Sequence, residues 1–187
     1  LAAYAGFAVI ILSFVTLIVA FARSDFSVAL VANNSHTLKP MIYKIAGAWG
    51  NHEGSMALWC LVTLGFGAAG ALWMRTGRDL FEARALGIQG LLAVGALAYL
   101  LFASSPFLRL DPAPFQGAGL NPLLQDPALS IHPPMLYLGY VGYSFVFALA
   151  AAGLMEARVD SVWAKEARRW SLAAFIPLTL GIALGSY

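Results

Sequence analysis

Residues 127–155 read PALSIHPPMLYLGYVGYSFVFALAAAGLM and contain no Asp, Glu, Lys or Arg. A helix that crosses a bilayer needs roughly 20 consecutive apolar residues. This stretch therefore predicts a membrane-spanning helix. It carries one histidine, His132, directly before Pro133 and Pro134, so a single imidazole is expected where the chain enters the membrane.

The rest of the chain has the same apolar character. It is 60% hydrophobic and 11% charged, whereas about a quarter of the residues in soluble domains are charged, and its mean hydropathy is +0.77. We predict an all-α integral membrane protein embedded in a lipid bilayer. Its five or so transmembrane helices are expected at residues 2–22, 54–74, 85–104, 134–155 and 170–187.

Residues 1–187 are expected to form a single membrane domain. Because the chain opens on Leu1 and ends inside an apolar run at Tyr187, we expect it to be a fragment of a longer protein. Cys60 is the only cysteine, which excludes a disulfide within the chain. The net charge of +2 and the lack of a basic block argue against nucleic acid as a partner.

The positions of the basic residues predict the orientation. Lys and Arg concentrate in cytoplasmic connections, and the two short connections of this chain are the more basic ones. The longer connections, at residues 23–53 and 105–133, are then periplasmic, and they are expected to fold back against the membrane domain. Residues 156–170, with Trp163 and Trp170, are typical of a short interfacial helix. The basic residues of the short connections are Arg75, Arg78, Arg84, Arg158, Lys165, Arg168 and Arg169.

His132 is the first candidate site residue. Proline is favoured in the first turn of a helix, so Pro133 and Pro134 predict that a helix starts there with His132 at or just before its cap. The positive end of the helix dipole disfavours a charged imidazole, which leaves a ring nitrogen free for iron or zinc. The alternative is a histidine that only caps the helix at the membrane surface.

Tyr137 and Tyr140 follow at spacings that align them, with Tyr143 and Phe147, along one helix face. Such a face is able to stack on a flat aromatic ligand. The alternative is a belt of interfacial aromatic residues that packs against other helices.

Residues 49–55, WGNHEGS, form a second candidate site. Asn51 is a suitable helix cap and Glu53 suits the first turn. His52 falls on the same membrane face as His132, either as a direct ligand or as a hydrogen-bonding residue that shapes the outer surface. Further along, Gly65, Gly67 and Gly70 form a small-residue face that favours close helix packing.

Four motifs in this order resemble the CcmF family of cytochrome c biogenesis proteins, together with its nitrite-reductase-associated relative NrfE. The resemblance covers nearly the whole chain. Its motifs are WGNHEGS at 49–55, LNPLLQDP at 120–127, HPP at 132–134 with YVG at 140–142, and LTLGIALGS at 178–186.

The resemblance implies a subunit of the bacterial cytochrome c maturation haem lyase in the inner membrane. Such a subunit accepts haem from a periplasmic haem chaperone and positions it for thioether attachment to apocytochrome c, alongside thiol-handling subunits. His132 would be the external axial ligand of the haem iron, with Tyr137 and Tyr140 as candidates for packing against haem. The ligands of a second, resident haem lie outside this chain.

Two other interpretations stay open. A transporter subunit for haem or another small molecule would have polar residues deep inside its spans, and here they are few, chiefly Gln89 and Thr63. A purely structural membrane scaffold would use His132 and His52 only as caps.

Overall fold

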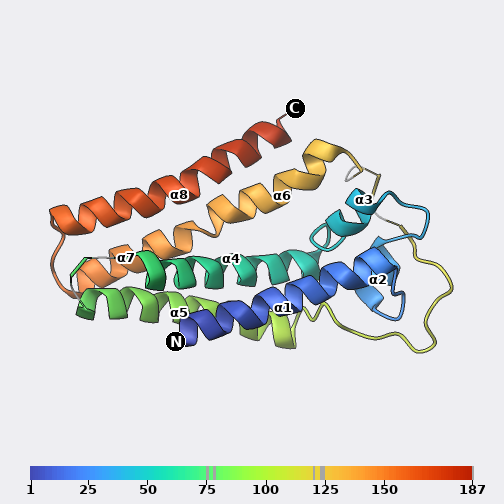
Figure 1. The fold of residues 1–187 in the computed structure, drawn as a ribbon, viewed down its shortest axis with the longest axis horizontal. Coiled ribbons are helices and arrows are strands. Elements are labelled where there is room, and N and C mark those ends of the chain that lie inside the picture. The colour runs from blue at the N-terminus through green and yellow to red at the C-terminus, as the bar shows by residue number, and fades with distance from the viewer. Residues whose placement is uncertain (75, 78, 120, 123–124, 187) are drawn as a thin grey trace.

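The computed structural model describes residues 1–74, 76–77, 79–119, 121–122 and 125–186. The predicted cytoplasmic residues Arg75 and Arg78, and Leu120, Leu123 and Leu124 of the LNPLLQDP motif, lie outside these ranges. The described part is almost entirely helical (Figure 1). Its helices are α1 (Ala2–Arg23), α2 (Ala29–Asn34), α3 (Met41–Ala46), α4 (His52–Trp73), α5 (Asp79–Phe102), α6 (Pro127–Tyr140), α7 (Tyr143–Met155) and α8 (Ser161–Gly185).

The long helices run side by side along the longest axis of the molecule. Figure 1 shows α6 and α7 following one another in one line, with α8 packed beside them and α4, α1 and α5 on the other side. The short helices α2 and α3 lie at one end with the two long connections. We call this the loop end (residues 24–51, 103–119, 121–122 and 125–126) and the opposite end the basic end (residues 74, 76–77, 79 and 156–160).

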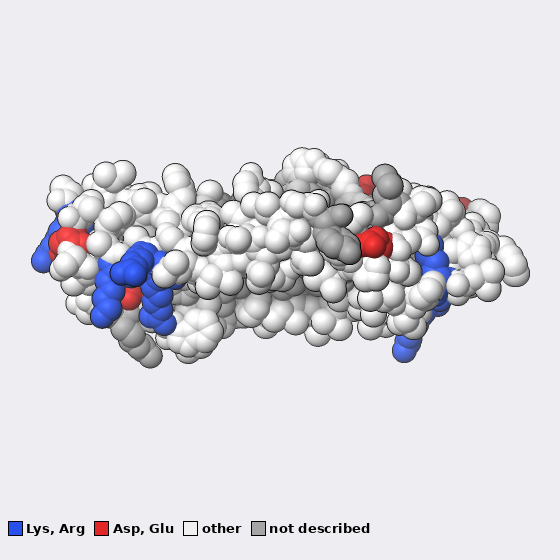
Figure 2. Space-filling model, turned by 90° about the horizontal axis from the view of Figure 1, so that it is seen from above, with Lys and Arg blue, Asp and Glu red and all other residues white. Residues whose placement is uncertain are grey.

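Length and composition support the predicted membrane protein. Among the described residues, four segments are long and apolar enough to cross a bilayer. On the face drawn in Figure 2 the charged residues gather towards the two ends, leaving the middle uncharged. The chain is an all-α integral membrane protein. The predicted fifth span falls in the second half of α8 and stays a prediction. The four segments are Ala2–Arg23, His52–Trp73, Asp79–Phe102 and Pro127–Met155.

The short interfacial helix predicted for residues 156–170 was wrong in its extent, because α8 continues without a break to Gly185. It begins after Asp160, whose carboxylate accepts the backbone N–H groups of Val162 and Trp163. The indole of Trp163 donates to the carbonyl of Leu149 at 3.0 Å. This bond holds the start of α8 against α7.

Side-chain and backbone contacts tie each end together. At the basic end, Arg84 of α5 pairs with Glu156 after α7 at 3.2 Å. At the loop end the two long connections pair with each other, since Ala29 N–H donates to Leu108 and Leu110 N–H donates to Ser27. That these connections also fold back against the membrane domain stays a prediction.

Asp25 anchors this pairing of the loops. The hydroxyl of Ser27 donates to its carboxylate at 2.6 Å and the Arg109 guanidinium lies at 3.4 Å. The Ser27 hydroxyl, with help from the Arg109 charge, holds the pKa of the Asp25 carboxyl below its ordinary value.

The glycines of α4 permit the close packing that their spacing predicted. A Cβ on Gly70 would lie 2.7 Å from Cε2 of Phe145 on α7, and one on Gly65 would lie 3.1 Å from Phe7 on α1. Beside Gly67, the buried amide of Gln89 donates to the Thr63 carbonyl at 2.8 Å and to the Ser144 hydroxyl at 3.0 Å. This polar contact joins α4, α5 and α7 inside the bundle.

Candidate functional site

The helix that carries His132 begins earlier than predicted. Asp126 is its N-cap, accepting the N–H groups of Ala128 and Leu129 at 2.8 and 3.0 Å, and Pro127 occupies the first helical position. Asp126 and Pro127 together form a stronger start signal than Pro133 and Pro134. The prediction that His132 caps the helix was therefore wrong: His132 lies in the second turn of α6.

Pro133 and Pro134 consequently sit inside α6, where neither has a backbone N–H to donate to the helix. A proline removes the hydrogen bond to the carbonyl four residues before it, which for Pro134 is that of Ser130. The indole N–H of Trp49 donates to this carbonyl at 2.9 Å. The WGNHEGS motif therefore supports the helix of the HPP motif, a role for Trp49 that sequence reasoning missed.

One nitrogen of the His132 ring is held by α8. Its Nδ1 lies 2.7 Å from the carbonyl oxygen of Gly181. A carbonyl only accepts hydrogen bonds, so Nδ1 carries a proton, and in the neutral ring Nε2 is then the nitrogen with the free lone pair. Metal-bound histidines commonly donate their other ring N–H to such an acceptor, which fixes the tautomer and the ring orientation.

Glycine at two positions of α8 makes this arrangement fit. A Cβ on Gly185 would lie 2.7 Å from Nδ1 of His132, and one on Gly181 would lie 2.8 Å from the backbone nitrogen of Leu136. In return, Gly139 of α6 lies against Leu178 of α8. The LTLGIALGS and HPP motifs therefore form one helix contact, which brings α8 close enough to hold the imidazole.

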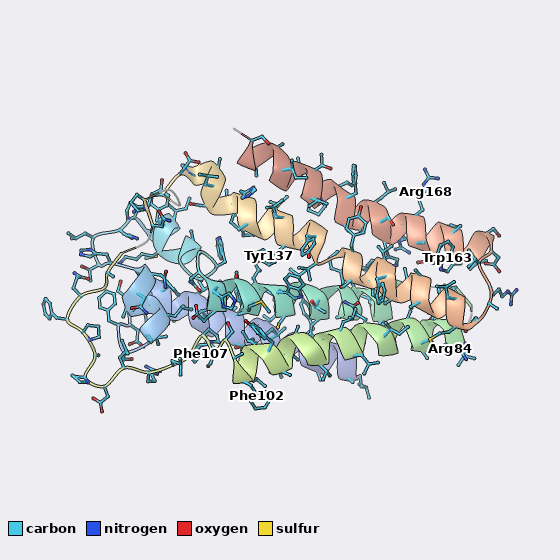
Figure 3. All side chains as sticks on the ribbon, turned by 180° about the vertical axis from the view of Figure 1, so that it is seen from behind. Arg84, Phe102, Phe107, Tyr137, Trp163 and Arg168 are labelled. Atoms are coloured by element: carbon cyan, nitrogen blue, oxygen red, sulfur yellow. The ribbon has the colours of Figure 1, made fainter. Side chains whose placement is uncertain are left out.

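Tyr137 and Tyr140 face a different neighbour. Both rings make edge contacts with Trp59 of α4, with ring centroids 6.1 and 5.4 Å apart, and Figure 3 shows Tyr137 where α6 approaches α4. His132, in contrast, contacts α8. The structure therefore does not bring the tyrosines and His132 onto one wall.

His52 has hydrogen-bonding partners of its own. Asn51 caps α4 as predicted, accepting the N–H of Gly54 at 2.7 Å, and His52 is the next residue. Its Nδ1 lies 3.1 Å from the Ser104 hydroxyl and its Nε2 lies 3.5 Å from the Tyr99 hydroxyl. His52 thus contacts the end of α5, away from the α8 residues that hold His132.

The donor set at His132 suits an axial ligand of haem iron. Among the described residues, no group of three or more His, Cys, Asp or Glu side chains could hold a metal ion. A structural zinc site needs four protein ligands, whereas an axial position on haem iron takes a single imidazole. A neutral His132 with Nε2 unprotonated meets that requirement.

Replacing Trp49 with Phe should loosen the start of α6. The variant keeps an aromatic ring but removes the indole N–H that donates to the Ser130 carbonyl, and a typical hydrogen bond within a protein contributes about 0.5–1.5 kcal/mol to stability. We expect a lower thermal midpoint of the full-length protein and faster amide exchange within residues 127–134. Unchanged exchange in that segment would show that the indole bond does not support α6.

The fold and the site define a class: a helical membrane protein that holds one oriented histidine between two helices near its loop end. Residues 49–187 match the family model described as cytochrome C assembly protein. The chain belongs to the cytochrome c assembly protein family.

Curated relatives agree with this family. The chain is 55% identical over its full length to the cytochrome c-type biogenesis protein ccl1 of Rhodobacter capsulatus, spanning 28% of that protein. It is 49% identical to CcmF of Escherichia coli over 93% of the chain and 27% of that protein. It is 40% identical to NrfE of Haemophilus influenzae over 89% of the chain and 26% of that protein. The chain thus spans little more than a quarter of these relatives.

A solved structure agrees as well. The chain superposes on the cytochrome c heme lyase CcmF with a TM-score of 0.81 and 26% sequence identity. The match covers 96% of this chain and 28% of that one. The resemblance predicted from the four motifs is confirmed.

Proposed function

We propose that this chain is the part of a cytochrome c maturation haem lyase that holds haem on the periplasmic face of the bacterial inner membrane, with His132 Nε2 as an axial ligand. The observation that carries the proposal is the bond between His132 Nδ1 and the Gly181 carbonyl at 2.7 Å. It fixes both the tautomer and the orientation that iron ligation needs.

Haem is the substrate in this proposal and supplies the iron and the vinyl groups. The task of this chain is positioning: α6 carries the ligand, α8 fixes its ring, and Trp49 supports the helix on the other side. Holding reactive groups in a fixed geometry lowers the entropic part of a barrier. The proposed partners are a periplasmic haem chaperone that delivers haem, apocytochrome c that accepts it, and the thiol-handling subunits that keep the acceptor cysteines reduced.

The bundle interior supports this function better than transport. A substrate path would need polar side chains available along the spans. The amide nitrogen of Gln89 instead bonds the Thr63 carbonyl and the Ser144 hydroxyl. The amide nitrogen of Gln89 is thus used between helices, while its Oε1 has no hydrogen-bond partner among the described residues; beyond Gln89 and Thr63, polar side chains inside the spans are few.

An absorption spectrum of the purified full-length protein tests the proposal. With haem supplied, the Soret band of His132→Ala should be weakened or shifted relative to the wild type, because the iron at this site loses an axial ligand, while the second haem, whose ligands lie outside this chain, keeps its own absorption. His52→Ala is the matched control, since its ring nitrogens face Ser104 and Tyr99, and its spectrum should equal that of the wild type. A Soret band altered by His52→Ala and not by His132→Ala would reassign the ligand.

A further inference from the structure

An apolar groove runs along the bundle between α1, α4, α6 and α8. Its volume is about 710 Å³ and its walls include Phe7, Leu61, Phe66, Leu138, Trp73 and Trp170. On α4 the lining extends from Leu58 to Trp73, 15 residue steps that correspond to about 22 Å of helix. One leaflet of a bilayer is half of a hydrocarbon core about 30 Å thick. The groove is therefore long enough for an extended acyl chain.

A guanidinium group lies where this groove reaches the basic end. Arg169 Nη1 donates to the carbonyl of Trp73 at 3.2 Å, and Trp73 and Trp170 both line the groove. The Arg169 side chain remains 53% exposed. Because a guanidinium has five N–H donors, the bond to Trp73 leaves others for a second acceptor.

The acidic group facing Arg169 does not satisfy it. Glu166 approaches Arg169 only to 4.0 Å and its side chain is 10% exposed. Its other carboxylate oxygen accepts the indole N–H of the buried Trp170 at 3.3 Å. Exposed guanidinium N–H donors therefore remain at the mouth of an otherwise apolar groove, beside the Glu166 carboxylate.

We propose that this groove binds one phospholipid with an anionic headgroup, its acyl chain along α4 and its phosphate on Arg169. The apolar walls match a hydrocarbon chain, and the charge at the mouth matches the headgroup layer of an anionic leaflet. The indoles of Trp73 and Trp170 lie at the same level, where membrane proteins concentrate tryptophan. The proposed headgroup contact lies between α4 and α8 towards the basic end, whereas the rest of the groove extends along α1 and α6.

Native mass spectrometry of the full-length protein, delipidated and then supplied with phosphatidylglycerol or phosphatidylcholine, tests the headgroup contact. Arg169→Ala should bind phosphatidylglycerol about fivefold more weakly, the effect of one basic residue near an anionic surface. Arg168→Ala is the matched control, because it removes the same charge from a side chain that points away from the other helices (Figure 3). Equal losses in the two variants would show a general charge effect and overturn the site.

Two changes inside the groove test the acyl chain. Ala69 lines the groove, so Ala69→Phe should fill it and abolish the retained phospholipid while leaving the Arg169 contact in place. A photoreactive amino acid at Leu61 in the full-length protein should crosslink to lipid. Crosslinking to another segment of the protein would instead show that a helix occupies the groove, and it would refute the lipid site.

Discussion

Cells whose full-length protein carries His132→Ala should assemble about tenfold less holocytochrome c, or less still. The substitution removes Nε2, the proposed axial ligand, whereas the bond from Nδ1 to the Gly181 carbonyl contributes only to the position of the ring. Mutation of even the residues that hydrogen-bond to a metal ligand lowers metal affinity or activity about 10–100-fold. The measurement is haem staining of c-type cytochromes, normalised to the amount of variant in the membrane.

Imidazole added to the medium provides the control. A free imidazole is able to occupy the space left by His132 and to supply the missing nitrogen, so part of the yield should return. Partial rescue separates a lost ligand from a misfolded protein, which imidazole would not restore. A wild-type yield from His132→Ala without imidazole would contradict the ligand role.

The second large effect is expected from Gly139→Ala, at the contact between α6 and α8. The added Cβ would lie 2.6 Å from both Cα and the backbone nitrogen of Leu178. Because backbone atoms cannot rotate away, the two helices must separate, and such overpacking costs about 1–3 kcal/mol. The separation would also pull the Gly181 carbonyl from His132, so both the thermal midpoint and the haem Soret band should change.

Gly95→Ala in α5 is the matched control for this substitution. Among the described residues, a Cβ at Gly95 would meet no side chain and no other helix within 4 Å, and alanine is favoured over glycine inside a helix by about 1 kcal/mol. The control should be neutral or slightly stabilising. If Gly139→Ala were equally well tolerated, the tight α6 and α8 contact would not be needed to hold the site.

Much of the fold was predictable because the bilayer restricts what an apolar chain can do. Charge-free windows and the glycines of α4 correctly predicted long, closely packed helices. The start of α6 was not predicted correctly, because both Pro127 and Pro133 suit a first turn and only the Asp126 cap distinguishes them. The length of α8 was missed because its charged first turns resemble a surface segment.

The sequence predicts the central residue of the site, His132, but not the residues that hold its ring in place. His132 stands out next to two prolines. The residues that orient it do so through backbone carbonyls and, where they are glycines, through the space that a missing side chain leaves. Gly181 and Gly185 lie far from His132 in sequence, since 49 positions separate His132 from Gly181. Nothing in the spacing of either motif indicates that the two helices meet. Trp49 was similarly hidden, because its partner is a backbone carbonyl 81 residues further along the chain.

The most direct test of the haem proposal is a structure of the full-length protein with haem bound at the periplasmic face. We predict iron within coordination distance of His132 Nε2, with Nδ1 still bonded to the Gly181 carbonyl. Iron bound through Nδ1, or haem held at that face without His132, would contradict the account.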